Sequence, residues 1–143
     1  MSHRLHPARL RLMGLTAAIE GLQREMAPLG IPVTFVHDAV PGLASDITLC
    51  LFRIVQESLQ NAVKYSRAQQ VSIRLLSAAE RVTLAVADDG AGFDVDTAWG
   101  RGLGLVSMKE RVEVLGGTFE IQSAPGEGTR LTVTVPLRLM HSP

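Results

Sequence analysis

The chain has 143 residues, 46% hydrophobic and 20% charged, and its 14 Lys and Arg residues balance its 14 Asp and Glu residues. A chain of this length and composition predicts one soluble domain with a substantial core, and the zero net charge with scattered basic residues argues against binding to nucleic acid or a membrane surface. Its one cysteine excludes an intrachain disulfide, which fits a reducing, cytoplasmic location.

A helix is predicted over residues 8–27, because apolar residues recur there at steps of three and four: Leu12, Leu15, Ile19, Leu22 and Met26. Pro28 and Gly30 end this helix. A strand follows over residues 31–37, and Pro32 predicts that it lies at a sheet edge, since proline cannot donate to a neighbouring strand.

A longer helix is predicted over residues 46–66, with Ser45 as its N-cap. The apolar face of this helix consists of Leu51, Val55, Leu59, Ala62 and Val63. On its other face Glu57, Asn61 and Lys64 follow one another at i, i+4 and i+7. Two interpretations stay open here. The stripe is either a solvated helix face or a carboxylate and an amide that flank Mg²⁺, followed by a lysine that meets phosphate.

Alternating apolar residues predict a hairpin of two strands over residues 71–75 and 82–86. The second strand runs into Asp88 and Asp89 and then into five glycines at positions 90, 92, 100, 102 and 104. Paired acids before glycine are common turn formers, yet a carboxylate at a pocket mouth also accepts a hydrogen bond from the exocyclic amine of adenine. Glycines ahead of a helix likewise let backbone amides approach phosphate, although the spacing matches neither a P-loop nor a dinucleotide fingerprint.

The remaining elements are a helix over residues 103–115 and strands over 118–122 and 129–135. We expect Val106, Val112 and Leu115 on the inner face of that helix. The order of helices and hairpins predicts an α+β domain in which helices cover one face of a mostly antiparallel sheet.

Four segments resemble, in the right order, the motifs of the ATP-binding catalytic domain of sensor histidine kinases, in the class shared with gyrase, the Hsp90 chaperones and MutL. Residues 52–66 resemble the asparagine box and residues 88–93 the first glycine box. Residues 100–105 resemble the second glycine box, and residues 126–129 the closing Gly-Thr element. The runs over residues 53–62 and 104–112 resemble the nitrate-sensor-like branch.

The resemblance implies a Bergerat fold, a two-layer α/β sandwich whose mixed, mostly antiparallel sheet of about five strands carries about three helices on one face. It implies binding of ATP and Mg²⁺, with Asn61 and Glu57 at the metal, and with Glu57 and Lys64 as catalytic residues near the phosphates. It also implies that Asp88 binds the adenine amino group and that Thr129 supports Asp88 in this role. The pocket and its lid then consist of Gly90, Gly92, Gly100, Gly102, Leu103, Gly104 and Leu105.

Two features depart from the family's pattern. Tyr65 stands where relatives often carry histidine, and the phosphoacceptor histidine followed by an acid is missing, because His3 precedes Arg4 and His6 precedes Pro7. We therefore expect the catalytic fragment of an ATP-dependent protein histidine kinase that does not phosphorylate itself. Its expected parts are a linker-helix segment (1–28) from a missing dimerisation hairpin, the ATP-binding catalytic domain (29–138) and a tail (139–143).

The partners implied are the dimerisation and phosphoacceptor domain of the same protein and a response regulator. We expect the fragment itself to be monomeric, without contacts to nucleic acid or to a membrane. Two alternatives remain: a stand-alone serine-kinase anti-sigma factor of the same ATPase class, and a degenerate domain that only docks partners.

Overall fold

A five-stranded sheet runs through the part of the chain that the computed structural model describes, residues 7–38, 40, 42–100 and 102–137. Its strands are β1 (Val33–His37), β2 (Val71–Ala78), β3 (Arg81–Asp88), β4 (Thr118–Ser123) and β5 (Thr129–Pro136). They lie in the order β1-β2-β3-β5-β4, with β1 and β2 parallel and every other pair antiparallel. The prediction of a mixed, mostly antiparallel sheet is therefore confirmed, and β1 is the edge strand that Pro32 indicated.

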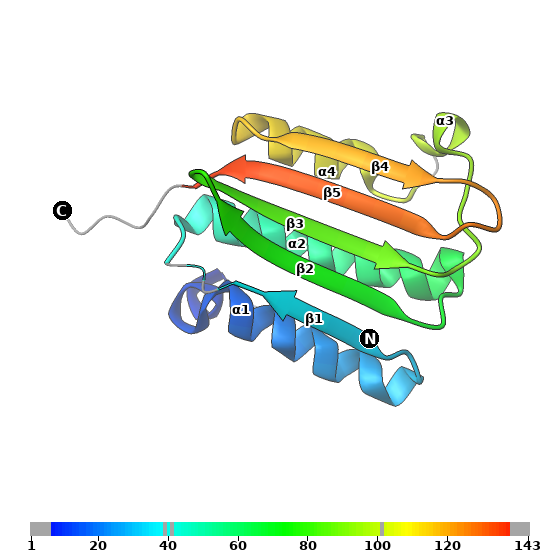
Figure 1. Ribbon diagram of the computed structural model, residues 1–143, viewed down its shortest axis with the longest axis horizontal. Helices are drawn as coiled ribbons and strands as arrows, with labels where there is room; N and C mark the ends of the chain where they lie inside the picture. Colours follow the sequence, from blue (N-terminus) through cyan, green and yellow to red (C-terminus); the bar gives the residue numbers. More distant parts are fainter. Residues whose placement is uncertain (1–6, 39, 41, 101, 138–143) are drawn as a thin grey trace.

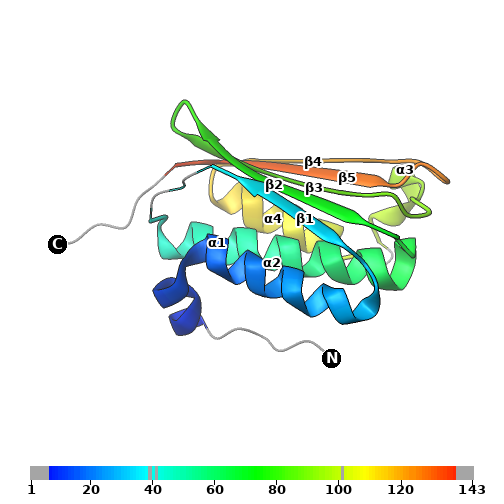
Figure 2. The same ribbon diagram turned by 60° about the horizontal axis from the view of Figure 1, so that its bottom comes forward.

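Three helices pack side by side on one face of this sheet: α1 (Pro7–Met26), α2 (Ser45–Asn61) and α4 (Leu105–Val114) (Figure 1, Figure 2). The short helix α3 (Val95–Ala98) lies at one end of the sheet, in a stretch that the sequence left as loop. A 3₁₀ turn over Ala27–Leu29 follows α1, and a π-helical turn over Ala62–Ser66 follows α2. No described helix covers the opposite face of the sheet (Figure 2), so the fold is the expected two-layer sandwich.

The core lies between the sheet and the helices. The register pairs Ile73 with Val86 and Val86 with Leu131, so alternate residues of adjacent strands point together toward the helices. From the helices, Ile19, Ile54 and Met108 are fully buried against them. Because α1 supplies Leu15, Ile19, Leu22 and Met26 to the same core cluster, the segment predicted as a linker packs with the domain that follows it.

Four expectations about the helices were wrong. Ser45 is the first residue of α2 and not its cap, because Ala44 holds the capping position and makes no side-chain bond there. Val63 and Val106 are 37% and 48% exposed, since the inner face of α4 is formed by Leu105, Met108 and Val112 and the π-helical turn rotates Val63 outward. Gly14, with φ 82° and ψ 162°, divides α1 into two helical pieces.

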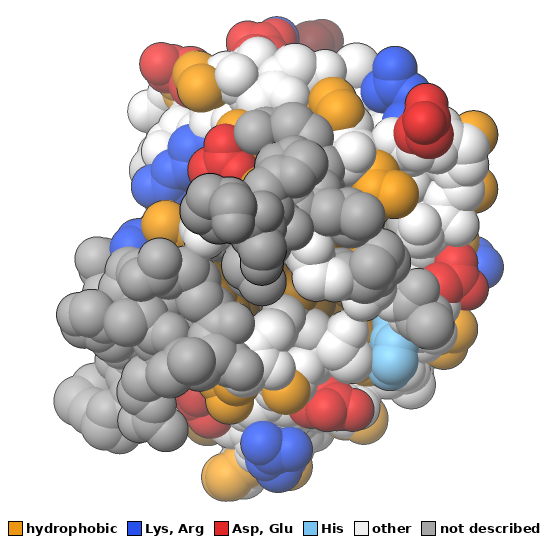
Figure 3. Space-filling view, turned by 90° about the vertical axis from the view of Figure 1, so that its left-hand side faces the viewer, with side chains coloured by type: hydrophobic (Ala, Val, Ile, Leu, Met, Phe, Trp, Pro, Cys, Tyr) orange, Lys and Arg blue, Asp and Glu red, His pale blue; other side chains and the backbone are white. Residues whose placement is uncertain are grey.

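Some expectations fall outside the described residues: the tail over 139–143, the first six residues of the predicted linker segment, and the inward position of the Leu12 side chain. None of the helices in the described ranges is both long and apolar enough to cross a membrane. On the end of the molecule shown in Figure 3, Lys and Arg side chains alternate with Asp and Glu, so the described surface there carries no patch of one sign.

Antiparallel pairing brings the chain's functional loops to one end of the sheet. Asp88, the last residue of β3, pairs with Thr129, the first residue of β5. The loop after β3 and the turn before β5 therefore meet at the end of the sheet where α2 finishes (Figure 1).

Candidate functional site

A small cavity lies between α2 and the ends of β3 and β5, with a volume of about 30 Å³. Apolar side chains form its walls: Val86, Phe93, Leu103, Leu105, Ile121 and Leu131. Polar side chains at its rim are Ser58, Asn61, Tyr65, Asp88 and Thr129. An apolar slot with a few convergent polar groups is typical of a site for a flat, partly polar ligand such as a nucleobase.

Asp88 is held in place by its own loop. Its Oδ1 atom accepts a hydrogen bond of 2.8 Å from the backbone N–H of Gly90. Beside it, the Thr129 hydroxyl lies 3.0 Å from the Ser123 hydroxyl, which also donates to the carbonyl of Gly128 at 2.8 Å and accepts from the N–H of Phe93 at 2.9 Å. These bonds fix the carboxylate and the threonine hydroxyl at the cavity rim, the arrangement that reading an amino-purine requires.

Two glycines allow the loop after β3 to lie against the turn before β5. Gly92 has φ +66°, and a Cβ atom there would overlap the carbonyl oxygens of Ala124 and Gly128. Gly128 has φ +71°, and a Cβ atom there would overlap the carbonyl of Asp88. No other residue fits either position, because both the backbone conformation and the space exclude a side chain.

The Ser58 hydroxyl at the cavity makes no hydrogen bond with the described residues. Its side chain is 8% exposed, and its Oγ atom has no hydrogen-bond partner among the residues that the structure describes. A buried hydroxyl without a partner carries a desolvation cost of about 1–3 kcal/mol, which a ligand or bridging water in the cavity removes. The cavity residues therefore suit a polar heterocycle better than a purely apolar ligand.

Asn61 joins the cavity to the glycine-rich segment. Its Nδ2 atom donates a hydrogen bond of 2.8 Å to the carbonyl of Leu103. Because a carbonyl oxygen only accepts, this bond fixes which end of the amide is nitrogen, and it places Oδ1 on the other side of the group. An amide oxygen is a ligand that Mg²⁺ accepts.

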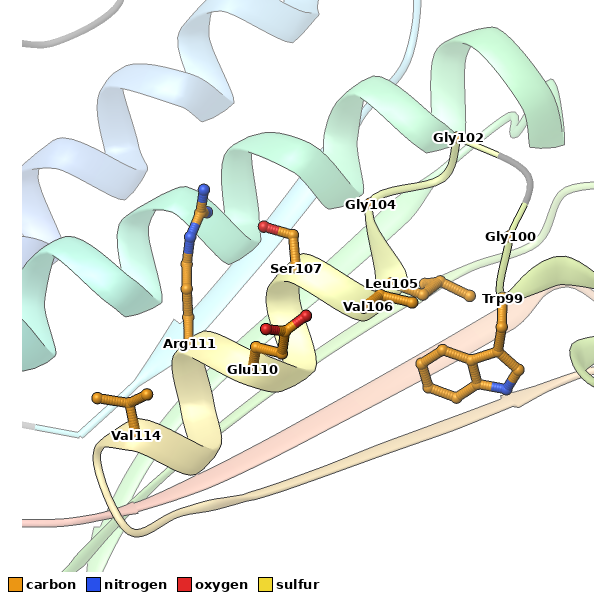
Figure 4. Close-up of a pocket in the computed structure, with 10 residues that line it drawn as sticks. All are labelled: Trp99, Gly100, Gly102, Gly104, Leu105, Val106, Ser107, Glu110, Arg111 and Val114. Carbon is orange, nitrogen blue, oxygen red and sulfur yellow. The ribbon is translucent and has the colours of Figure 1, made fainter.

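A second and more open cavity of about 580 Å³ lies next to the first, and the two share Leu105. It is lined by residues 99, 100, 102 and 104–107, with Glu110, Arg111 and Val114 from the later turns of α4 (Figure 4). Gly102 and Gly104 adopt φ +77° and +74°, and Gly104 is the N-cap of α4. The first turn of α4 therefore faces a space large enough for phosphates, and helix N-termini favour anions.

Glu57 reaches this same region from α2. Its Oε1 atom lies 3.0 Å from Nη1 of Arg111, and a Cβ atom on Gly104 would overlap its Oε2 atom. Among the described residues, no group of three or more His, Cys, Asp or Glu side chains is placed to hold a metal. The donors Asn61 and Glu57 nevertheless suit Mg²⁺, which is bound by one or two protein oxygens together with phosphate oxygens.

Lys64 does not join this cluster. It lies in the π-helical turn and lines a separate groove between α1 and α2, with residues that include Leu22, Met26 and Gln60. The expected stripe of Glu57, Asn61 and Lys64 is therefore broken after Asn61, because the wider turn changes the angular spacing of the residues that follow. Tyr65 instead faces the small cavity.

Asp89 has a structural place although it neighbours Asp88. Its Oδ1 atom accepts hydrogen bonds from the backbone N–H groups of Gln70 and Gln69, at 3.0 and 2.8 Å. These bonds lower the pKa of the exposed Asp89 carboxyl below its usual range. Asp89 thus ties the start of β2 to the end of β3 and does not face the cavity.

Sequence reasoning missed three residues of the site: Ser58, Ser123 and Arg111. Ser58 lies three residues before Asn61, so helical spacing alone puts it on the same face. Ser123 and Arg111 gave no comparable signal, because Ser123 meets Phe93 and Arg111 meets Glu57, which are 30 and 54 residues away in sequence.

The chain is similar in sequence to a known protein family and to known proteins. Residues 47–139 match the family described as histidine kinase-, DNA gyrase B- and HSP90-like ATPase. The sensor histidine kinase ComP of Bacillus subtilis is 36% identical over 140 residues, which cover 94% of this chain and 18% of ComP. The sensor protein VraS of Staphylococcus saprophyticus is 39% identical over 111 residues, which cover 75% of this chain and 31% of VraS. The chain therefore spans less than a third of the length of these relatives.

Solved structures share the fold. The histidine kinase domain of the blue-light activated histidine kinase of Erythrobacter litoralis superposes with a TM-score of 0.69 at 24% identity, over 86% of this chain and 61% of that one. The ATP binding domain of PrrB from Mycobacterium tuberculosis has a TM-score of 0.62 at 23% identity, over 87% of this chain and 94% of that one. At these identities the likeness establishes the arrangement of strands and helices.

Proposed function

Since this chain belongs to the histidine kinase-, DNA gyrase B- and HSP90-like ATPase family, we propose that it binds ATP with Mg²⁺ and donates the γ-phosphoryl group to a histidine of a dimerisation domain. That histidine then serves as the phosphoryl source for a response regulator. The chain works in the cytoplasm, where ATP is available, and it is the catalytic part of a longer sensor kinase of the nitrate-sensor-like branch.

The observation that carries the proposal is the small cavity with Asp88 at its rim. Its walls are apolar enough to stack against a purine, and Asp88 is fixed by Gly90 where an exocyclic amine needs an acceptor. Ser58 supplies a buried hydroxyl that lacks a partner among the described residues, and Thr129 lies beside Asp88 across the β3–β5 pair. At about 30 Å³ the cavity is far below the usual size of a ligand pocket, so its walls must move apart to admit adenine.

The phosphates belong in the open cavity at the start of α4. Backbone amides of the Gly102–Gly104 segment and the N-terminus of α4 offer donors there, and Asn61 and Glu57 offer oxygens for Mg²⁺. When bound, Mg²⁺ neutralises charge on the transferring phosphoryl group. The residues of the chain align the nucleotide, while Glu57, near the γ-phosphate, would hold Mg²⁺ through its oxygens or would accept the proton of the incoming imidazole as a general base.

Lys64 remains the phosphate contact that the family resemblance implies, but the structure offers that role no direct support. Its side chain lines the groove between α1 and α2. Contact with phosphate therefore requires the Lys64 side chain to leave that groove when the nucleotide binds.

Phosphoryl transfer in this scheme forms a bond between the γ-phosphorus and an imidazole nitrogen of the acceptor histidine. The bond from that phosphorus to the bridging oxygen breaks, and ADP leaves with the electron pair. Catalysis then rests on positioning and charge neutralisation, which a preformed pocket supplies without a covalent intermediate.

The test is transfer in trans. The chain is mixed with a histidine-bearing dimerisation domain of the parent kinase, with γ-labelled ATP and Mg²⁺. We expect label on the acceptor that is lost in acid and stable in base, as phosphohistidine is. Acid-stable label on a serine of another protein supports the anti-sigma kinase alternative, and binding of partners without nucleotide supports the docking alternative.

A further inference from the structure

The Arg111–Glu57 pair connects two elements of the proposed active site that are 54 residues apart in sequence. The guanidinium of Arg111, on the second turn of α4, donates to the carboxylate of Glu57 on α2 at 3.0 Å. Their side chains are 37% and 28% exposed. An ion pair this accessible adds little to folding stability, because solvent screens it.

The carboxylate is bonded through one oxygen and lies beside the start of α4 with the other. Oε1 meets Arg111, and a Cβ atom on Gly104 would overlap Oε2. Gly104, the N-cap of α4, lies seven residues before Arg111, and long side chains on a helix reach back toward its N-terminus. The Arg111 bond thus keeps the Glu57 carboxylate beside the first two turns of α4, at the helix end that faces the open cavity.

Arg111 itself lines that open cavity (Figure 4). Its side chain extends from α4 toward α2, and Ser107 lies one turn before it on the same helix. The charged and titratable groups around it are Glu57, Glu110 on the cavity wall and the Cys50 thiol, whose pKa Arg111 lowers against the larger effect of burial. Of these, Glu57 alone bonds to Arg111 among the described residues.

We propose that Arg111 is a positioning residue that holds the Glu57 carboxylate at the start of α4 for phosphoryl transfer. This rests on the proposed function, in which Glu57 acts next to the γ-phosphate. A carboxylate displaced by about 1 Å from its working position costs on the order of 100-fold in rate. The adenine end of the proposed nucleotide site consists of Asp88 and the walls of the small cavity, and Arg111 does not line that cavity.

The experiment measures two quantities on each variant: the dissociation constant for ADP and Mg²⁺ by calorimetry, and the single-turnover rate of transfer to the dimerisation domain. We expect Arg111→Ala to lower the transfer rate roughly 10- to 100-fold with less than about a threefold change in the dissociation constant. Arg111→Lys restores part of the rate, because a point charge reaches one oxygen without the fork geometry. Arg53→Ala, which removes the same charge from α2 one turn before Glu57, is the matched control and leaves both values near wild type.

A double mutant separates action through Glu57 from action on the nucleotide. In the Glu57→Gln background, adding Arg111→Ala causes no further loss of rate if Arg111 acts through that carboxylate. Three results overturn the proposal. The first is a further tenfold loss of rate when Arg111→Ala is added to Glu57→Gln. The others, in the Arg111→Ala single variant, are a tenfold weaker affinity for ADP and Mg²⁺ or an unchanged transfer rate. A wild-type chain that binds no nucleotide refutes the proposed function instead, so the two failures are distinct.

Discussion

Asn61 and Leu103 are joined by a hydrogen bond of 2.8 Å from the side-chain amide of one to the backbone carbonyl of the other. The bond ties the end of α2 to the glycine-rich segment that leads into α4. It also turns the amide oxygen of Asn61 away from that segment, so the oxygen is oriented before any metal arrives. In the proposed function, one side chain thereby couples the Mg²⁺ ligands to the glycine-rich loop beside the phosphates.

Replacement of Asn61 by Ala removes both the oxygen ligand and the bond to Leu103. We expect the affinity for ADP with Mg²⁺ to fall about tenfold or more, while affinity without metal changes much less. Calorimetry with and without Mg²⁺ measures both. Gln60→Ala is the control, because Gln60 is the neighbouring amide and lines the groove between α1 and α2. Equal losses with and without metal would show that Asn61 is not a metal ligand.

The Gly92→Ala variant tests the contact between the two loops at the cavity rim. The new Cβ atom meets two backbone carbonyls at a positive φ. We expect a loss of roughly 2–4 kcal/mol in the free energy of unfolding, measured with urea. Gly100→Ala changes that free energy by no more than about 0.5 kcal/mol, because nothing lies within 4 Å of a Cβ atom at that position. Equal stabilities of the two variants contradict the close approach.

The local spacing of apolar and polar residues predicted most of the fold. The alternation in β2, β3 and β5 and the apolar spacing in α1 and α2 specify their buried faces, and Pro32 marks the edge strand correctly. Contacts between residues far apart in the sequence could not be predicted from that local spacing. No property of residue 111 taken alone indicates that its guanidinium meets Glu57, and the π-helical turn that moves Lys64 away from Asn61 has no signal in the local sequence pattern. The family motifs pointed to Asp88 and Asn61, which line one cavity in the structure, but only the structure shows that Asp89 bonds to the backbone of Gln69 and Gln70.

Asp89 makes the stability of the chain sensitive to acid. Its lowered pKa means that folding favours the carboxylate, whose bonds to the N–H groups of Gln70 and Gln69 are present at neutral pH. That contribution is lost as the pH falls below about 4, where protonation begins. Urea unfolding from pH 7 to pH 3 therefore shows a steeper decline for the wild type than for Asp89→Asn. Parallel curves contradict the assigned role.

Cys50 makes the stability of the chain sensitive to alkaline pH. Burial raises the pKa of its thiol to about 11, an effect that Arg111 reduces and Asp46 enhances. An unfolded cysteine ionises near pH 8.5, so stability declines as the pH rises from about 8.5 toward 11. Cys50→Ala removes this part of the decline. The native thiol is also expected to react slowly with a disulfide reagent at pH 8, and rapid reaction of the folded chain contradicts its burial.

The central claim is that the cavity beside Asp88 binds adenine. Calorimetric titration of ATP with Mg²⁺ into the chain and two aspartate variants tests it directly, and Trp99, the chain's one tryptophan, gives a fluorescence signal from the adjoining cavity. We expect one-site binding for the wild type and for Asp89→Asn, and at least about tenfold weaker binding for Asp88→Asn. No heat from the wild type, or equal affinities for all three proteins, contradicts the account.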